Sequence, residues 1–136
     1  MSRMKGSSFF CEDIRTEQSG QPMFIGVISP VFEFTNPNEV MRRLFFVSFF
    51  YPEPEHIGIE IVLNLSITHP GEEAEFKKGP LVRKVSEEIS EEDEENMIIV
   101  ILPIDEANIR PGSKVTARLE YGDEIEEYTL RAKPTN

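Results

Sequence analysis

Apolar and polar residues alternate along much of the chain with a period of two, which is typical of strands that bury one face. Residues 57–68 show the alternation most clearly, with an apolar side chain at every second position. Residues 113–121 repeat it, with Val115 and Leu119 in the apolar phase. Both segments are therefore predicted to be strands with one face in a core.

A hairpin is predicted where the second of these strands meets residues 124–132. A Gly-Asp pair at positions 122–123 separates the two segments, and glycine readily supplies the positive φ of a tight turn. The apolar phase of the last strand changes after Ile125. We therefore expect a β-bulge near Glu126 and Glu127.

Three further strands are predicted in the first half of the sequence. Residues 8–17 and 22–29 flank a Ser-Gly turn, which indicates another hairpin, and apolar residues on both faces of the second segment favour a central position in a sheet. Residues 43–51 form a dense aromatic run that stops at Pro52 and Pro54. Proline cannot donate to a sheet ladder, so the strand should end there.

Two remaining strands differ in polarity. Residues 80–89 are charged and weakly apolar, so we expect them at the edge of a sheet. Residues 97–102 form an uninterrupted apolar run, as in a strand buried on both faces. Residues 38–43 follow an Asn-Pro breaker and are compatible with one turn of helix. An Arg-Pro-Gly turn at 110–112 leads into the next strand.

About eight strands without an amphipathic helix indicate an all-β chain. Its 136 residues are the usual size of one domain, and 39% hydrophobic residues, including ten Phe, are enough for a core. The favoured fold is an antiparallel, immunoglobulin-like β-sandwich formed by residues 1–136, with an acidic loop at about 86–95. A closed β-barrel is the alternative, because closure also removes exposed edges.

Charge and composition exclude several classes of function. Twenty-five acidic and 14 basic residues give a formal charge of −11, which argues against direct binding to nucleic acid. One cysteine excludes an intramolecular disulfide, and with only two histidines no metal site or other cofactor is expected. The longest apolar run is far below the roughly 20 residues of a membrane span, and the first residues do not predict a signal peptide. We expect a soluble, cytoplasmic protein that does not bind membranes.

The opening of the sequence resembles the N-terminal signature of a family of small bacterial proteins of uncharacterised function. The resemblance lies in residues 11–17 (Cys-Glu-Asp-Ile-Arg-Thr-Glu), Gly20 and residues 24–28 (Phe-Ile-Gly-Val-Ile). The turn at 110–112 is similar to the start of the family's C-terminal hairpin. Phe24 and the acidic insertion after Ser86 depart from the family pattern. The resemblance implies a single-domain β-sandwich and carries no catalytic residue.

Cys11 is the candidate nucleophile, with His56 or His69 as its base. The neighbouring Glu12 and Asp13 should raise the pKa of the thiol, which opposes activation, so we favour a buried structural cysteine. The two histidines flank a strand that separates them by roughly 40 Å, so they are not expected to share a metal ion. We expect both in solvent-exposed loops.

A structural polar network is predicted in the first hairpin from Asp13, Arg15 and Glu17. Arg15 stands within reach of both acidic residues, and a pair with either of them would hold the hairpin. We assign these residues a structural rather than a catalytic role.

Residues 86–95 contain seven acidic residues and no basic one. They lack the glycine and the alternating oxygen ligands of an EF-hand loop, so a calcium site is not expected. The run is either a solvated loop extended by self-repulsion or a docking site for a partner protein with a basic surface. A third interpretation, ranked behind these two, is that the acidic run imitates the charge of DNA and so occupies the binding site of a nucleic-acid-binding protein. The candidate docking residues are Glu87, Glu88, Glu91, Glu92, Asp93, Glu94 and Glu95.

Signatures of enzymes are absent from the sequence. It contains no Gly-rich phosphate loop, no serine elbow and no Walker-like lysine, so no catalytic residue is assigned. We hypothesise a non-enzymatic binding domain, a protein-interaction or regulatory module that recruits its partner through an edge strand. The alternative is a small-molecule or glycan-binding sandwich with a pocket between loops, where Tyr51, Tyr121 and Tyr128 are available for a glycan. An enzyme that uses Cys11 is the third hypothesis.

Overall fold

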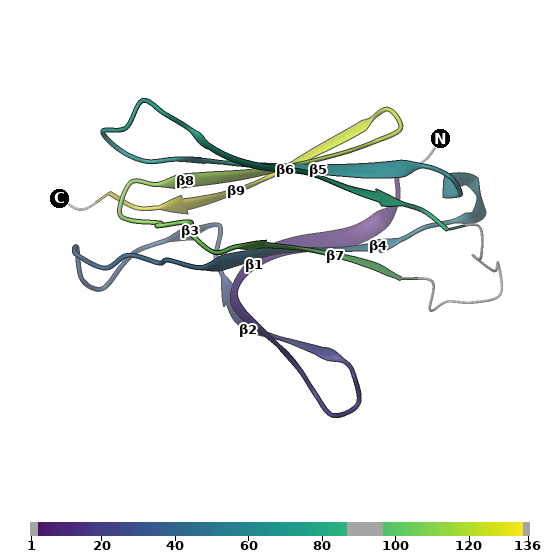
Figure 1. Ribbon diagram of the computed structural model, residues 1–136, viewed down its shortest axis with the longest axis horizontal. Coiled ribbons are helices and arrows are strands. Elements are labelled where there is room, and N and C mark those ends of the chain that lie inside the picture. Colours follow the sequence, from purple (N-terminus) through teal and green to yellow (C-terminus); the bar gives the residue numbers. More distant parts are fainter. Residues whose placement is uncertain (1–2, 87–96, 135–136) are drawn as a thin grey trace.

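The computed structural model describes residues 3–86 and 97–134, which fold into nine β-strands in two sheets (Figure 1). The strand order is β2-β1-β4-β7 in the four-stranded sheet and β3-β9-β8-β5-β6 in the five-stranded sheet. The only helical segment in these two ranges is a single 3-10 turn, η1 (Pro54–His56). The strands are β1 (Lys5–Thr16), β2 (Pro22–Ile28), β3 (Val31–Phe32), β4 (Leu44–Tyr51), β5 (Glu60–Thr68), β6 (Phe76–Lys84), β7 (Ile98–Ile104), β8 (Lys114–Tyr121) and β9 (Glu124–Ala132).

The two sheets lie face to face, and the core fills the space between them (Figure 1). Alternate residues of β5 and β8, such as Leu63 and Leu119, are buried there, as the sequence pattern predicts. Phe46 of the four-stranded sheet belongs to the same cluster. This is the two-layer arrangement of a β-sandwich. The barrel alternative is wrong, because the two sheets keep separate edges instead of joining.

The hairpin of β8 and β9 keeps one register along its whole length. The bulge expected near Glu126 and Glu127 is therefore wrong. The unbroken register sets Glu126 opposite the buried Leu119, in the same inward phase as Tyr128, whereas Ile125 is outward and 56% exposed. The change of phase in the sequence reflects an inward-facing carboxylate and not an inserted residue.

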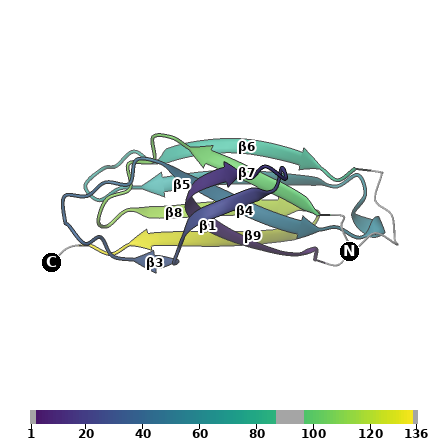
Figure 2. The same ribbon diagram turned by 90° about the horizontal axis from the view of Figure 1, so that it is seen from below.

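β1 and β2 form the predicted first hairpin, but β2 lies at an edge of the four-stranded sheet and not at its centre. The hairpin leaves its layer in Figure 1 and crosses the outer face of the sheet in Figure 2. Within β2, Gly26 adopts a φ of 67°, which side chains rarely allow. Phe24 packs against Phe9 and Phe49, with ring centroids 5.1 and 5.5 Å apart. The apolar residues on both faces of β2 are therefore explained by a hairpin that folds back and packs on its own sheet.

β7 forms the other edge of the four-stranded sheet, so the expectation of a strand buried on both faces is wrong. Val100 and Leu102 are buried in the core, whereas Ile99 and Ile101 are only half-buried on the outer face. The continuous apolar run therefore combines a core face with an outer apolar face.

β6 is the edge of the five-stranded sheet, as predicted for the charged strand, although it spans Phe76–Lys84 and so starts earlier and stops sooner than expected. Residues 38–43 do not form the expected helical turn. Met41 instead pairs with Ile109 in an isolated antiparallel bridge. This bridge ties the loop before β4 to the loop after β7.

Candidate functional site

A carboxylate in the gap between the sheets is the first candidate site. The Glu126 side chain is 9% exposed and accepts a hydrogen bond from the Tyr128 hydroxyl (2.9 Å) and a longer one from the Tyr121 hydroxyl (3.4 Å). Arg3 Nε also donates to this carboxylate. A buried carboxylate is costly unless it is paired. Here two donors from the same hairpin and Arg3 from the start of the chain supply the pairing.

This network extends to the four-stranded sheet through two serines. Tyr128 is hydrogen-bonded to Ser8 on β1, and the hydroxyls of Ser8 and Ser48 lie 2.7 Å apart beside a hollow of about 320 Å³. Burial is the largest cause of the raised pKa of both Tyr121 and Tyr128, and Glu126 raises it further. The tyrosines therefore remain protonated donors at neutral pH, which suits them to hold Glu126 and to link the sheets.

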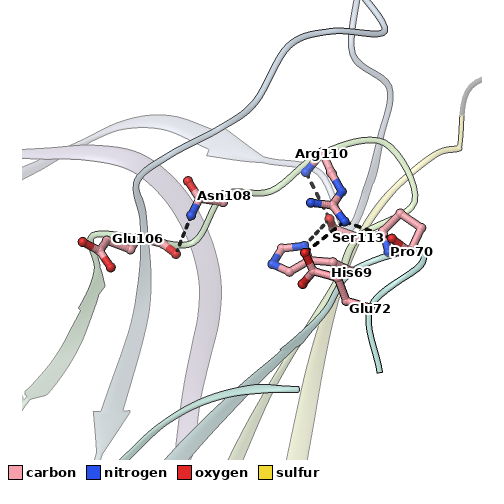
Figure 3. A network of polar contacts seen from close by, with 7 residues as sticks. All are labelled: His69, Pro70, Glu72, Glu106, Asn108, Arg110 and Ser113. Atoms are coloured by element: carbon pink, nitrogen blue, oxygen red, sulfur yellow. Dashed lines mark hydrogen bonds and ion pairs between the residues drawn. The ribbon is translucent and has the colours of Figure 1, made fainter. Parts of the chain in front are cut away.

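A second polar cluster lies where the β5–β6 and β7–β8 connections meet (Figure 3). His69 Nδ1 is 2.8 Å from the hydroxyl of Ser113, and that hydroxyl accepts the Arg110 N–H at 3.0 Å. Arg110 Nη2 donates to the Pro70 carbonyl (2.9 Å) and lies 3.3 Å from Glu72 Oε1. These contacts fasten one connection to the other.

The local backbone explains why the cluster forms. Gly112 has a φ of 91°, and a Cβ at this position would lie 3.1 Å from Pro70 Cγ, so glycine lets the turn close on the β5–β6 connection. The bridge between Met41 and Ile109 brings in the β3–β4 loop. Asn108 has a φ of 49°, which asparagine tolerates better than most residues.

Three connections thus surround an open hollow of about 560 Å³. Val40 and Phe76 supply apolar groups to its lining, and Arg42, His69 and Asn108 supply hydrogen-bond donors. Among these residues only His69 is a candidate from the sequence. The others come from segments that are far apart in the sequence, so only the fold brings them together.

A third feature is the side of the sandwich where the edges β6 and β7 run next to each other (Figure 2). A groove of about 170 Å³ lies between them. Its lining is apolar except for Arg83 and includes Leu81, Val82, Ile99 and Ile101. It is the most apolar of the three candidate sites in residue composition.

Cys11 lies buried on the outer face of the four-stranded sheet, in a cluster with Phe45 and Val47. Burial raises its pKa to about 11, and the charge of Asp13 contributes a smaller increase. Among the described residues, no hydrogen bond connects the thiol to His56, and the ring of His69 is bonded to Ser113 instead. The geometry of a nucleophile with a histidine base is not present.

The expectation of two solvent-exposed histidines is wrong for His56, which is fully buried in η1. Its Nδ1 accepts the N–H of Glu53 at 2.8 Å, and its Nε2 is 3.5 Å from Glu55 Oε1. The ring is thus part of the cap of a 3-10 turn. His69 is half-buried at the opposite end of β5.

In the first hairpin, Arg15 Nε lies 3.3 Å from Asp13 Oδ2, and both side chains are exposed. Asp13 Oδ1 also accepts the N–H of Ile14. Glu17 contributes through its backbone, because its N–H donates to the Gln21 carbonyl across the turn. The seven acidic residues named as candidate docking groups, Glu87 to Glu95, lie outside the described residues.

Within residues 3–86 and 97–134, no cluster of three or more His, Cys, Asp or Glu side chains is suited to a metal ion. No helix in the same ranges is long and apolar enough to cross a membrane. Compared with known proteins, the chain matches no family model and shows no significant similarity to a curated protein.

Proposed function

We propose that this protein is a non-enzymatic binding domain that accepts an extended segment of a partner protein along the free edge of β7. The observation that carries the proposal is an edge strand without a charged residue, beside a groove whose lining is apolar except for Arg83. Exposed sheet edges bind extended segments through backbone hydrogen bonds, and flanking apolar pockets select the side chains.

The backbone of β7 has donors and acceptors directed to its open side. Lys78 Nζ donates to the carbonyl of Pro103, so this carbonyl points away from β4 and toward β6. Residues two apart in an antiparallel ladder share the same orientation. Ile101 and Ile99 therefore direct their N–H and C=O groups to the groove.

The edge of β6 is protected against pairing with an extended segment. Of its nine residues, four are basic and none is acidic, and Pro80 has no N–H to offer. Basic residues and proline are common means of preventing the pairing of an edge. β7 lacks these charges, and its one proline, Pro103, stands next to its C-terminal end, so Ile99 and Ile101 keep their N–H groups for pairing. We therefore assign the acceptor role to β7 and the guarding of the groove to β6.

A partner of a different sequence is favoured over a second copy of this chain. Two copies, each with a formal charge of −11, repel one another. Antiparallel pairing of β7 with itself would also bring Asp105 and Glu106 of one copy toward the residues before β7 of the other, where the sequence is strongly acidic. We therefore propose a partner whose extended segment is uncharged where it lies beside the basic β6, and whose surface away from this segment is basic.

The experiment is capture from a lysate of the source organism, with Ile101→Pro, Val82→Lys and Val27→Lys compared with the wild type. Proline at position 101 removes a donor directed to the groove, and Val82→Lys adds a charge to its lining. Val27 is a matched control, because it is also an exposed valine on an edge strand, at the opposite edge of the four-stranded sheet. We expect the first two variants to lose the partner and the control to keep it.

Hydrogen exchange of the captured complex tests the mode of binding. The amides of Ile99 and Ile101 should exchange quickly in the free protein and slowly in the complex. Retention of the partner by Ile101→Pro, or unchanged exchange at both amides, would show that β7 is not the acceptor. Failure of the wild type to retain any protein would contradict the interaction module itself.

The strand order supports an immunoglobulin-like topology as part of this proposal. In immunoglobulin domains, strands B and E belong to one sheet and C, F and G to the other. Here β4 and β7 are neighbours in one sheet, and β5, β8 and β9 are neighbours in the other, which is the same distribution. A cytoplasmic location and membership of the bacterial family with the Cys-Glu-Asp-Ile-Arg opening complete the proposal.

A further inference from the structure

The hollow between the β3–β4, β5–β6 and β7–β8 connections has a polar wall whose central donor is held in place. Ser113 is 1% exposed, and its hydroxyl already accepts the Arg110 N–H. The hydroxyl proton is then available to His69 Nδ1, 2.8 Å away. The Ser113 oxygen also has a second lone pair, so the contact alone fits either tautomer of the ring. We assign the tautomer in which Ser113 donates to Nδ1 and His69 carries its own proton on Nε2, the ring nitrogen that faces away from Ser113 in Figure 3.

Among the described residues that line the hollow, one cation is available for a ligand. Arg110 is engaged by Glu72 and by the Pro70 carbonyl, so its charge is balanced. Arg42 lines the same hollow and forms no ion pair within the described part of the chain. The Glu106 carboxylate also belongs to the lining, but it points away from His69 and Arg110 in Figure 3. An arginine and a fixed N–H donor are the groups that bind a carboxylate or phosphate.

The remaining wall is apolar. Val40 and Phe76 line the hollow and are 48% and 37% exposed, so both have surface left to cover. A volume of about 560 Å³ lies within the usual range of pockets for small molecules. A bare inorganic anion would leave this apolar wall uncovered.

We propose that this hollow binds a small organic oxyanion, with its carboxylate or phosphate on Arg42 and His69 and its apolar body on Phe76 and Val40. The site is separate from the β7 edge and shares no lining residue with the groove there. The proposal therefore does not depend on the protein-interaction function.

The test is an NMR titration of the full chain with phenyl phosphate and benzoate, and with inorganic phosphate and phenol as matched fragments. Phenyl phosphate or benzoate should shift the amides of Arg42, Asn108 and Arg110 at low millimolar concentration. Each fragment should bind more weakly than the compound that joins an oxyanion to a ring. A response to only one of the two ring compounds would identify phosphate or carboxylate as the preferred group.

Arg42→Gln and Arg43→Gln form a matched pair of variants, because each removes one exposed arginine and the two are adjacent in sequence. Arg43 faces elsewhere, with its guanidinium 3.6 Å from Asp105 and 4.7 Å from the ring centroid of Phe45. Arg42→Gln should weaken binding about tenfold or more, as expected for loss of a charged hydrogen bond, while Arg43→Gln should leave it unchanged.

His69→Ala is the second binding variant, and its melting temperature shows whether the fold survives. We expect weaker binding in a folded protein. The proposal is overturned if neither ring compound shifts the named amides, if inorganic phosphate binds as tightly as phenyl phosphate and benzoate, or if both arginine variants bind equally well.

Discussion

The four-stranded sheet has phenylalanines on both faces, but the two faces are covered in different ways. On the inner face, Phe10, Phe46 and Phe50 pack under the five-stranded sheet and are almost fully buried. On the outer face, Phe45 is buried beside Cys11, but Phe9 and Phe49 are covered only in part, by the folded-back hairpin. Consecutive Phe-Phe pairs in β1 and β4 supply one ring to each face. Apolar character therefore does not distinguish the core face from the outer face; a covering sheet does.

The largest difference between the faces is expected for a matched pair of truncations on β4. Phe46→Ala should lower the free energy of unfolding by about 3–5 kcal/mol, because it leaves a cavity in a closed core. Phe49→Ala, on the outer face, should cost roughly 1–2 kcal/mol, because a half-buried ring loses less buried area. Urea unfolding monitored by circular dichroism measures both. Equal losses would mean that the hairpin covers its face as completely as a sheet does.

The next largest change in the free energy of unfolding is expected for Glu126, the carboxylate between the two sheets. Glu126→Ala should lower the free energy of unfolding by about 1–3 kcal/mol, because it leaves the Tyr121 and Tyr128 hydroxyls without their acceptor. Glu126→Gln retains an acceptor and should cost less. Ile125→Ala, at the exposed neighbouring position, is the control and should change stability least. If the alanine variant at 126 is as stable as the wild type, the carboxylate does not link the sheets.

The packing of the β1–β2 hairpin against the outer face of the four-stranded sheet should depend on Gly26. Gly26→Ala should cost about 1–2 kcal/mol, because alanine disfavours the positive φ at this position. Its Cβ would also crowd the Glu12 side chain, at 3.2 Å from Glu12 Cβ. Labelling of the Cys11 thiol by a disulfide reagent should become faster as the hairpin loosens.

Gly20→Ala is the control for this experiment, because Gly20 has a φ of 86° but open space around it. It should leave the labelling rate of Cys11 nearly unchanged. Equal acceleration in both variants would show that the turn and not the crowding at Gly26 controls the cover.

The smallest effect is expected in the pH dependence of stability. The pKa of Cys11 is raised from 9.0 to about 11 in the folded protein, so the folded state favours the protonated thiol. The resulting stability is present below pH 9 and is lost as the pH rises toward 11. Cys11→Ala should flatten the decline in free energy of unfolding between pH 9 and 10. An identical slope in the variant would indicate that Tyr121 and Tyr128, whose pKa values are also raised, cause the decline.

The sequence predicts those parts of the fold that depend on local pattern. Alternation located β5 and β8, Pro52 marked the end of β4, and the Gly-Asp pair marked the last turn. These signals lie within a few residues of the structure they specify. The order of strands in a sheet depends on pairing between distant segments, so the edge positions of β2 and β7 were not predictable in this way.

The candidate sites show the same limit. Glu126 looked like a disturbance of the strand pattern, because its partner Arg3 is distant in the sequence. The loop hollow depends on the turn at Gly112, which the Arg-Pro-Gly sequence predicts, and on the bridge of Met41 to Ile109, which leaves no motif. His69 was visible as a histidine, but its role as a fixed donor depends on Ser113.

The short parallel pairing of β3 with β9 has a consequence for biosynthesis. Val31 pairs with Arg131, so an early segment of the nascent chain must wait for one of the last strands to leave the ribosome. Such long-range pairings slow folding, because the chain loses the entropy of loop closure before the new contacts stabilise it. A chain that has released β7 but not β8 and β9 exposes the bare edge of β7 together with an unfilled core. In this interval the chain is most prone to aggregate and most dependent on chaperones.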